Sequence, residues 1–451
     1  MKETLPNDID ELKAKILTLL DKIAKLEAEN AELRRRLGLN SENSHKPPSS
    51  DGLKKKPAFP RGKHKNNGGQ EGHAGKTLEP VANPDCIVIH NPTLCSCCGR
   101  VFDESEIETI KARQVFDLPP PKLIVTEHRV GRAWCCGRSQ EGEFPQNVTQ
   151  PVQYGSGVYT LCTLLSVQYR LPQEQISQLF DDVYGQTVNT ATVINTLERA
   201  YRLLEPVEQK NKQGLLAEEV VNFDESGVRA VGKNHWVHVA CSQNYTYLFA
   251  HASRGLEAMS SVQSVIKDFT GSAVHDCLPS YFLFEPCSHV ICNAHILREL
   301  ASLIECGSSW AKNMHHFLMG CYRLEKPPSS LRQTYDDILL LADQEEPPPA
   351  YKKRGRPKQS VGRCLLNRLR TYKEGVLAFA FDKTIPFTNH QAERDIRCVK
   401  TKLKVSGGFR SISGLNCYAR IQSVISTWRK QRLNVFSQLN RLFCNQPIMG
   451  G

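Results

Sequence analysis

Three carboxylates occupy positions where proteins commonly build a metal site. Asp224 ends the apolar run VVNF, and Asp276 follows a second strand-like run in FTGSAVHDCLPSYFLF. Glu393 lies in IPFTNHQAERDIRCVKTKLK, whose spacing predicts a helix that begins near Thr388 or Asn389. Hard divalent cations prefer carboxylate oxygens, and two Mg²⁺ or Mn²⁺ ions held this way can promote in-line phosphoryl transfer. Taken singly, an Asp that follows a strand is more often only a turn former.

The helix expected around Glu393 also carries a series of cations. Asn389, Glu393 and Arg397 share one stripe of that helix with two lysines further along. A carboxylate among cations suits a metal ion and a phosphate backbone at once, although an exposed Glu393–Arg397 ion pair of roughly 0.3 kcal/mol explains the spacing as well. We expect five residues of this segment to contact DNA phosphates: Arg394, Arg397, Lys400, Lys402 and Lys404.

Positive charge is concentrated in three stretches of the chain. Its 451 residues include 58 Lys and Arg against 47 Asp and Glu, a formal net charge of +11, and the excess falls within 41–76, 351–373 and 394–432. Such clusters indicate a polyanionic partner, nucleic acid before acidic membrane, while solvated linkers explain any single cluster. In the second stretch, RGRPK matches the core of a minor-groove hook, although a solvated linker is the preferred interpretation. The residues concerned are Arg354, Arg356 and Lys358.

The cysteines include one set with metal-ligand spacing. Seventeen cysteines are scattered along the chain, and no secretory signal suggests a disulfide framework. Cys95 and Cys98 have the CxxC spacing of a zinc knuckle, and Cys135 and Cys136 lie further along, so the four could hold a structural Zn²⁺. Adjacent cysteines in an extended chain diverge, which leaves a metal-free module as the alternative. For the Cys292-x-x-His295 pair (CNAH), a packing role is preferred over metal binding.

The first forty residues show a heptad repeat. Leucines recur every seven residues at position d, with Ile and one Asn at position a. This pattern favours a parallel two-stranded coiled coil, in which a buried Asn sets the register. A helix that packs on its own chain is the alternative. The predicted dimer contacts are Leu12, Ile16, Leu19, Ile23, Leu26, Asn30 and Leu33.

These patterns together predict a multidomain α+β protein. Residues 151–216 have helical periodicity and resemble a helix-turn-helix, although a plain pair of core helices fits equally well. No run is long and apolar enough to cross a membrane and the N-terminus lacks a secretory signal, so a cytoplasmic protein is expected. The expected parts are a coiled coil (1–40), a basic linker (41–79), a small β-rich zinc-finger-like module (80–150), a helical DNA-binding region (151–216), the first part of a core (217–300), a helical insertion (301–384) and the final core helices (385–445).

From the basic linker to about residue 440, the chain resembles the insertion sequence 66 family of bacterial transposases. The resemblance rests on FDESGVR, NHWVHVACS, RGLEAM, VHDCLPSYF, CNAHILREL, TNHQAERDIR and SGGFRSISG, in that order. It implies an RNase H-like DDE core with Asp224, Asp276 and Glu393 as its acids. Two departures are His390, where the family usually has a second asparagine, and Trp134, which occupies the first position expected for the second cysteine pair.

The resemblance also implies an activity and partners. The expected protein is a dimeric, nucleoid-associated bacterial transposase that binds its element's ends and cleaves and joins DNA strands with Mg²⁺. Small accessory proteins encoded by the same element are expected partners. The alternatives are a catalytically silent DNA-binding relative and a Mg²⁺-dependent nuclease on the same core.

Overall fold

The computed structural model describes residues 8–38, 78–108, 111–349 and 359–448. The linker and the basic stretch that contains Arg354, Arg356 and Lys358 lie outside the described residues. The chain divides into two compact units, each of which is described by itself. One comprises Met1–Gly52, Glu127–Asp182 and Gln186–Gly451, and the other comprises Leu53–Thr126 and Val183–Gly185.

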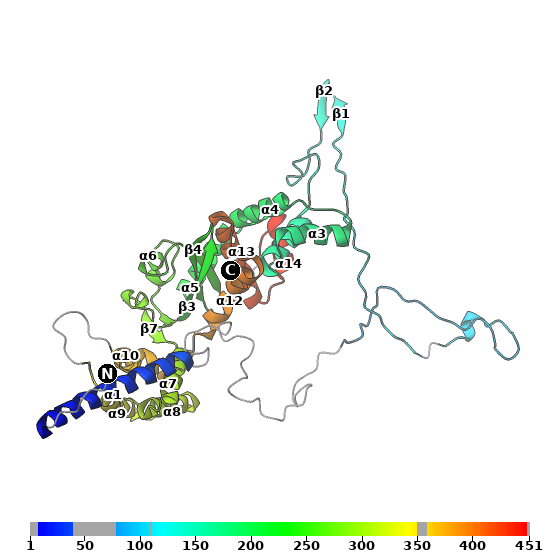
Figure 1. Ribbon diagram of the computed structural model, residues 1–451. Helices are drawn as coiled ribbons and strands as arrows, with labels where there is room; N and C mark the ends of the chain where they lie inside the picture. Colours follow the sequence, from blue (N-terminus) through cyan, green and yellow to red (C-terminus); the bar gives the residue numbers. More distant parts are fainter. Residues whose placement is uncertain (1–7, 39–77, 109–110, 350–358, 449–451) are drawn as a thin grey trace, which may run out of the picture. The chain divides into compact units, whose positions relative to one another are not determined.

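A five-stranded mixed sheet forms the centre of the larger unit (Figure 1). Its strands are β3 (Val220–Ala230), β4 (Lys233–Cys241), β5 (Thr246–His251), β6 (Ser272–His275) and β7 (Ser288–Ile291), in the order β5-β4-β3-β6-β7. The first three form an antiparallel meander, and β6 and β7 run parallel to β3. A two-residue turn with positive φ at Val231 and Gly232 joins β3 to β4 and suits the twist of a hairpin.

The two faces of the sheet have separate cores. Alternation along β3 directs Val228 and Ala230 toward α12 (His390–Ser406) and α13 (Ile412–Lys430). Val221 and Phe223 face the opposite core. Three short segments, α6 (Leu256–Met259) and the 3₁₀ turns Ile266–Asp268 and Tyr281–Leu283, contribute to that second core with α5 (Glu205–Leu216).

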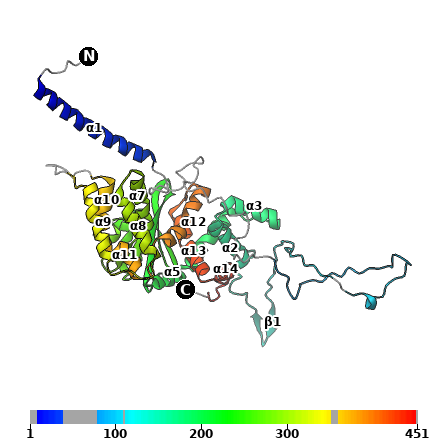
Figure 2. The same ribbon diagram turned by 90° about the horizontal axis from the view of Figure 1, so that it is seen from below.

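Five helices between β7 and α12 build a core of their own. They are α7 (Asn293–Glu305), α8 (Ser309–Arg323), α9 (Leu331–Glu345), α10 (Val361–Thr371) and α11 (Lys373–Phe381). Trp310 and Tyr335 are fully buried among them, and the Tyr335 hydroxyl donates to the Leu369 carbonyl at 2.9 Å. Figures 1 and 2 show the group beside the β7 end of the sheet, where α11 packs on β7. The described residues of the segment expected as a helical insertion (301–384) form helices joined by short connections.

Two helices before the sheet also join the main core: α2 (Ser156–Thr163), which continues as a π-helical turn (Leu164–Gln168), and α4 (Thr190–Leu203). Between them lies α3 (Gln173–Tyr184), and α14 (Val435–Phe443) ends the fold. Ala200 and Leu204 are fully buried, and α4 packs against α2 and α13. The apolar side of α4 therefore packs in the core, which is the arrangement expected if these helices are a plain pair of core helices.

Outside this core, α1 (Ile9–Gly38) is a single helix. The cysteine region has little regular structure: a 3₁₀ turn (Glu104–Glu106) and a hairpin of β1 (Arg132–Cys135) and β2 (Arg138–Glu141). The expected β-rich module is wrong for residues 111–131, which form no strand. Pro119, Pro120 and Pro121 remove three consecutive ladder donors there.

Candidate active site

The strand register places the first two acids in one row. Val220 pairs with Ser272 and Asn222 with Val274 in the parallel β3–β6 ladder. When this register is continued by two residues, Asp224 lies beside Asp276, which directly follows β6. Asp224 itself is not at the end of its strand as expected: β3 continues to Ala230, because β4 still pairs with it after β6 has ended.

Asp224 is a half-buried residue whose carboxylate lies beside other carboxylates. It lies on the α12 face of β3, between Asn222 and Ser226 in the alternation. Burial raises the pKa of Asp224 to about 7, and the nearby charges of Glu225 and Asp276 raise it further, while the Glu225 amide and Lys400 act in the opposite direction. Taking a carboxylate out of water among like charges disfavours its ionised form unless a cation compensates.

A fourth carboxylate, which the sequence analysis missed, lies on the other face of β3. Glu225 is buried and accepts hydrogen bonds from the Arg254 guanidinium at 2.8 Å and from the Tyr281 hydroxyl at 2.9 Å. Burial raises the pKa of Glu225, and the charge of Asp276 adds to the effect. The FDES and RGLEAM motifs contain both partners of this ion pair, but only the folded structure shows that they meet.

Glu393 lies in the first turn of α12, and Asn389 attaches that turn to β3. Asn389 occupies the N-cap position, but its side chain makes no capping hydrogen bond. Its Nδ2 donates to the Phe223 carbonyl at 2.7 Å, and its Oδ1 accepts from Asn222 Nδ2 at 2.9 Å. Both asparagines are buried. The start of α12 is therefore fixed to the strand residues that immediately precede Asp224.

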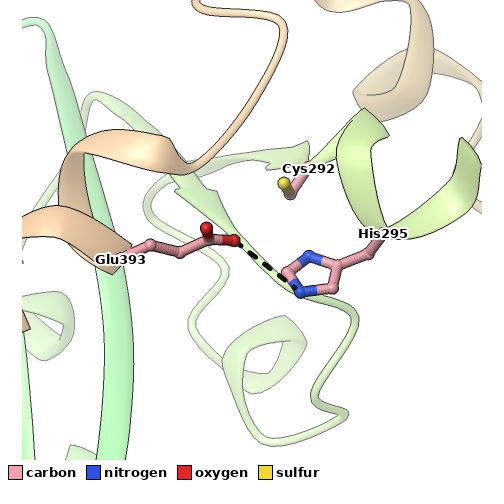
Figure 3. A group of neighbouring side chains, drawn as sticks. All are labelled: Cys292, His295 and Glu393. Atoms are coloured by element: carbon pink, nitrogen blue, oxygen red, sulfur yellow. Dashed lines mark ion pairs between the residues drawn. The ribbon is translucent and has the colours of Figure 1, made fainter. Parts of the chain in front are cut away.

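The Glu393 carboxylate faces the start of α7, where the chain leaves β7. Its Oε1 lies 3.9 Å from His295 Nε2, and Figure 3 shows both side chains directed toward each other beneath Cys292. Cys292 Sγ, a ring nitrogen of His295 and a Glu393 oxygen all lie within 4.8 Å of one another. Continuing the β6–β7 register places Cys292 beside Asp276, and the Cys292 amide donates to the His275 carbonyl at 3.0 Å.

The cations expected to contact DNA do not share one environment. Arg394, Arg397, Lys400 and Lys404 are exposed along α12, whereas Lys402 is half-buried. Burial lowers the pKa of Lys402, and the charge of Arg170 lowers it further. Four of the five residues are thus available on the outside of the helix that carries Glu393.

Both halves of the cysteine set have a local geometry that suits a metal ion. In the first, the Cys95 amide donates to the Arg100 carbonyl and the Gly99 amide to the Cys95 carbonyl, which closes a tight turn. The backbone amide of Cys97, followed by that of Cys98, lowers the pKa of the Cys95 thiol.

In the second half, Cys136 has a positive φ of 53° in a hairpin turn. The sulfurs of Cys135 and Cys136 therefore lie 3.6 Å apart. Adjacent cysteines diverge only in an extended chain, so the objection raised from the sequence does not apply here.

Comparison with protein families finds three matches in this chain. Residues 151–416 match the family described as the Transposase IS66 family. Residues 92–137 match the zinc-finger binding domain of transposase IS66, and residues 2–79 match a family of unknown function. Among curated proteins, none matches the chain. The first match covers more than half of the sequence and includes the three candidate acids, and the second includes the four candidate zinc ligands.

Proposed function

This chain belongs to the IS66 transposase family, and we propose that it cleaves the ends of its DNA element and joins them to target DNA with Mg²⁺. The observation that carries the proposal is the placement of Asp224 on β3 beside Asp276, which directly follows the parallel strand β6, with α12 and its Glu393 attached to β3 by Asn389. The strand order and directions agree with an RNase H-like core, which we infer as the fold of the larger unit.

The residues present fit a hard divalent cation. Partial burial, followed by the charges of Glu225 and Asp276, raises the pKa of Asp224, and Glu393 Oε1 is buried without a hydrogen-bond partner among the described residues. We infer that Asp224, Asp276 and Glu393 would hold two Mg²⁺ or Mn²⁺ ions. Bound there, the ions would supply Lewis-acid activation of the attacking oxygen and of the leaving 3′ oxygen.

The exposed cations of α12 would position the DNA backbone. Arg394, Arg397, Lys400 and Lys404 offer N–H donors to phosphate oxygens without reading bases. Arg354, Arg356 and Lys358 are proposed to add non-specific phosphate contacts, and Lys402 contributes less because it is half-buried.

The remaining parts are assigned roles around this core. We propose that Cys95, Cys98, Cys135 and Cys136 hold one structural Zn²⁺, since the 3.6 Å separation of the last two sulfurs is close to the edge of roughly 3.8 Å in a tetrahedron of 2.3 Å Zn–S bonds. We propose that helix α1 forms a coiled coil with α1 of a second copy of the chain, so that the dimer holds both ends of the element. We also propose that the protein acts in the bacterial cytoplasm, in association with the nucleoid. Accessory proteins of the element are proposed partners.

Cleavage of a labelled duplex that carries the element's end tests the catalytic assignment. Wild-type protein with Mg²⁺ should nick the strand at the end, and Asp224→Asn, Asp276→Asn and Glu393→Gln should each lower the rate by at least about a thousandfold. Asp268→Asn removes a half-exposed acid outside the row and should cleave like wild type. Equal cleavage by Asp224→Asn and wild type would refute the assignment.

A further inference from the structure

The group formed by Cys292, His295 and Glu393 has a ligand set unlike that of the proposed magnesium centre. We propose that these residues form a second cation site, selective for Zn²⁺ and similar transition-metal ions, that shares Glu393 with the catalytic site. The sharing rests on the proposed function, whereas the metal site itself does not. Among the described residues, this is the group whose Cys, His and carboxylate donor atoms converge within 4.8 Å.

Main-chain contacts hold the three ligands in place. Cys292 is the residue before α7, His295 lies in the first turn of α7, and Glu393 lies in the first turn of α12. The two helix starts are joined because the Asn293 amide donates to the Phe387 carbonyl at 3.1 Å. The Asn389 amide also donates to Cys292 Sγ at 3.1 Å, a contact that orients the sulfur. The two helix starts that carry the ligands are therefore held together by hydrogen bonds of the main chain.

The chemistry of the donors favours a different ion from Mg²⁺. A thiolate and an imidazole prefer Zn²⁺ or Co²⁺, whereas Mg²⁺ prefers oxygen ligands alone. Tetrahedral Zn²⁺ with S, N and O ligands requires donor separations of roughly 3.3–3.8 Å. His295 Nε2 and Glu393 Oε1 are 3.9 Å apart and all three donor atoms lie within 4.8 Å of one another, so a closure of about 1 Å would suffice. On binding, the Cys292 thiol gives its proton to solvent, and the fourth coordination position remains open for water.

Sharing Glu393 makes the two sites compete. A Glu393 carboxylate turned toward Cys292 and His295 is withdrawn from a cation beside Asp224 and Asp276. Zn²⁺ should therefore inhibit Mg²⁺-dependent cleavage even when Mg²⁺ is in excess, because the thiolate and imidazole add ligands that Mg²⁺ cannot use. The occupied site would hold the enzyme inactive where free Zn²⁺ is high.

Co²⁺ titration of the full chain tests the metal site without any assay of cleavage. The background variant would replace Cys95, Cys98, Cys135 and Cys136 with Ser, so that the zinc-finger thiolates do not contribute. We expect one equivalent of Co²⁺ with near-ultraviolet thiolate-to-cobalt absorption. Cys292→Ser should abolish this absorption, and Cys306→Ser, which changes an exposed cysteine just after the same helix, should retain it.

His295→Gln provides a second variant at a less buried position, should Cys292→Ser fail to fold. It should weaken Co²⁺ binding by at least about tenfold, whereas Asp224→Asn should bind Co²⁺ as the background does. Absence of the absorption in the background variant, or its persistence after His295→Gln and Cys292→Ser, would overturn the site.

Inhibition is then measured separately in active protein. The concentration of Zn²⁺ that halves Mg²⁺-dependent cleavage should rise at least about tenfold in Cys292→Ser, and an unchanged value would overturn the competition. If no variant cleaves DNA but the cobalt absorption behaves as expected, the proposed function fails and the metal site stands.

Discussion

At the scale of single residues, Asp224 determines how the site behaves without metal. Its side chain is half-buried, and this loss of solvent, together with the charges of Glu225 and Asp276, raises its pKa to about 7. An ionised carboxylate in this position costs stability, and a bound cation would remove that cost. The ionised Asp224 carboxylate therefore lowers the stability of the metal-free protein but favours binding of a cation, as expected of a metal ligand.

Replacing Asp224 with the neutral Asn should consequently stabilise the metal-free protein. In EDTA at about pH 8, we expect the unfolding free energy of Asp224→Asn to exceed that of wild type by a few kcal/mol, as a pKa raised by about three units implies. Added Mg²⁺ should raise the melting temperature of wild type and leave that of the variant unchanged. Thermal unfolding measures both effects. A variant that is less stable than wild type in EDTA would contradict the account.

The buried histidine His238 makes the stability of the fold depend on pH. Burial lowers the pKa of His238 to about 4, His251 and Arg254 lower it further, and the Ser253 carbonyl acts in the opposite direction. Because the unfolded chain binds this proton first, the stabilisation is complete above about pH 6.5 and is lost as the pH falls toward 4.

Urea unfolding at about pH 7.5 and pH 5 should show this loss. We expect wild type to lose roughly 2 kcal/mol more unfolding free energy than His238→Gln between these pH values. His235→Gln, which changes a less buried histidine of the same strand, should follow wild type. Equal losses in wild type and His238→Gln would show that His238 does not cause the effect.

At the scale of elements, the placement of α12 against β3 decides whether the acids can act together. Asn389 occupies the N-cap position of α12, but its side chain bonds Asn222 and the Phe223 carbonyl instead of capping the helix. The sequence predicted a helix that begins near this residue, and the structure confirms it. The Asn389 side chain attaches the helix to a strand residue 166 positions earlier in the chain. The sequence could not predict this contact, because the same polar group can either cap a helix or make a tertiary hydrogen bond.

Asn389→Ala should therefore lower cleavage far more than its effect on stability suggests. We expect a loss of about 1–3 kcal/mol in unfolding free energy and at least a tenfold drop in the cleavage rate. Asn189→Ala removes a true N-cap, since Asn189 accepts from the Ala191 amide at 2.8 Å, and should cost about 1 kcal/mol without slowing cleavage. Similar cleavage by both variants would contradict the positioning role.

The sequence patterns predicted which strands and helices form better than they predicted where each one ends. The strand-like and helical segments around the acids were identified because their periodicity is local, but the first of these strands was expected to end at Asp224. In the structure β3 runs through Gly227, where an added Cβ would lie 3.7 Å from the Trp236 ring of β4. Trp236 lies on another strand, so no local pattern could reveal the contact. The Glu225–Arg254–Tyr281 contacts were missed for the same reason.

At the scale of the whole molecule, α1 is a helix that contributes no residue to the three cores found among the described residues. The a and d residues of α1 that can be assessed are largely exposed, with Ile23 at 49% and Leu26 at 63%. An exposed apolar stripe along a heptad repeat indicates association. The proposed partner is a second copy of this chain, because a transposase must hold two element ends.

Deleting residues 1–40 should convert the dimer to a monomer near half its mass, measured by light scattering. Leu19→Lys with Leu26→Lys should have the same effect, since both would bury charges in the seam. Thr18→Lys lies outside the a and d positions and should remain dimeric. An unchanged mass for the truncated protein would exclude α1 as the dimerisation element.

We propose that one site both cuts and joins DNA, and a strand-transfer assay measures the joining step by itself. Labelled element ends that already carry a free 3′-hydroxyl would be incubated with target plasmid, Mg²⁺ and protein. We predict joined products for wild type and for Asp268→Asn, and none for Asp224→Asn, Asp276→Asn or Glu393→Gln. Cleavage of intact ends without any joining of pre-cut ends would contradict the account and identify the protein as a nuclease.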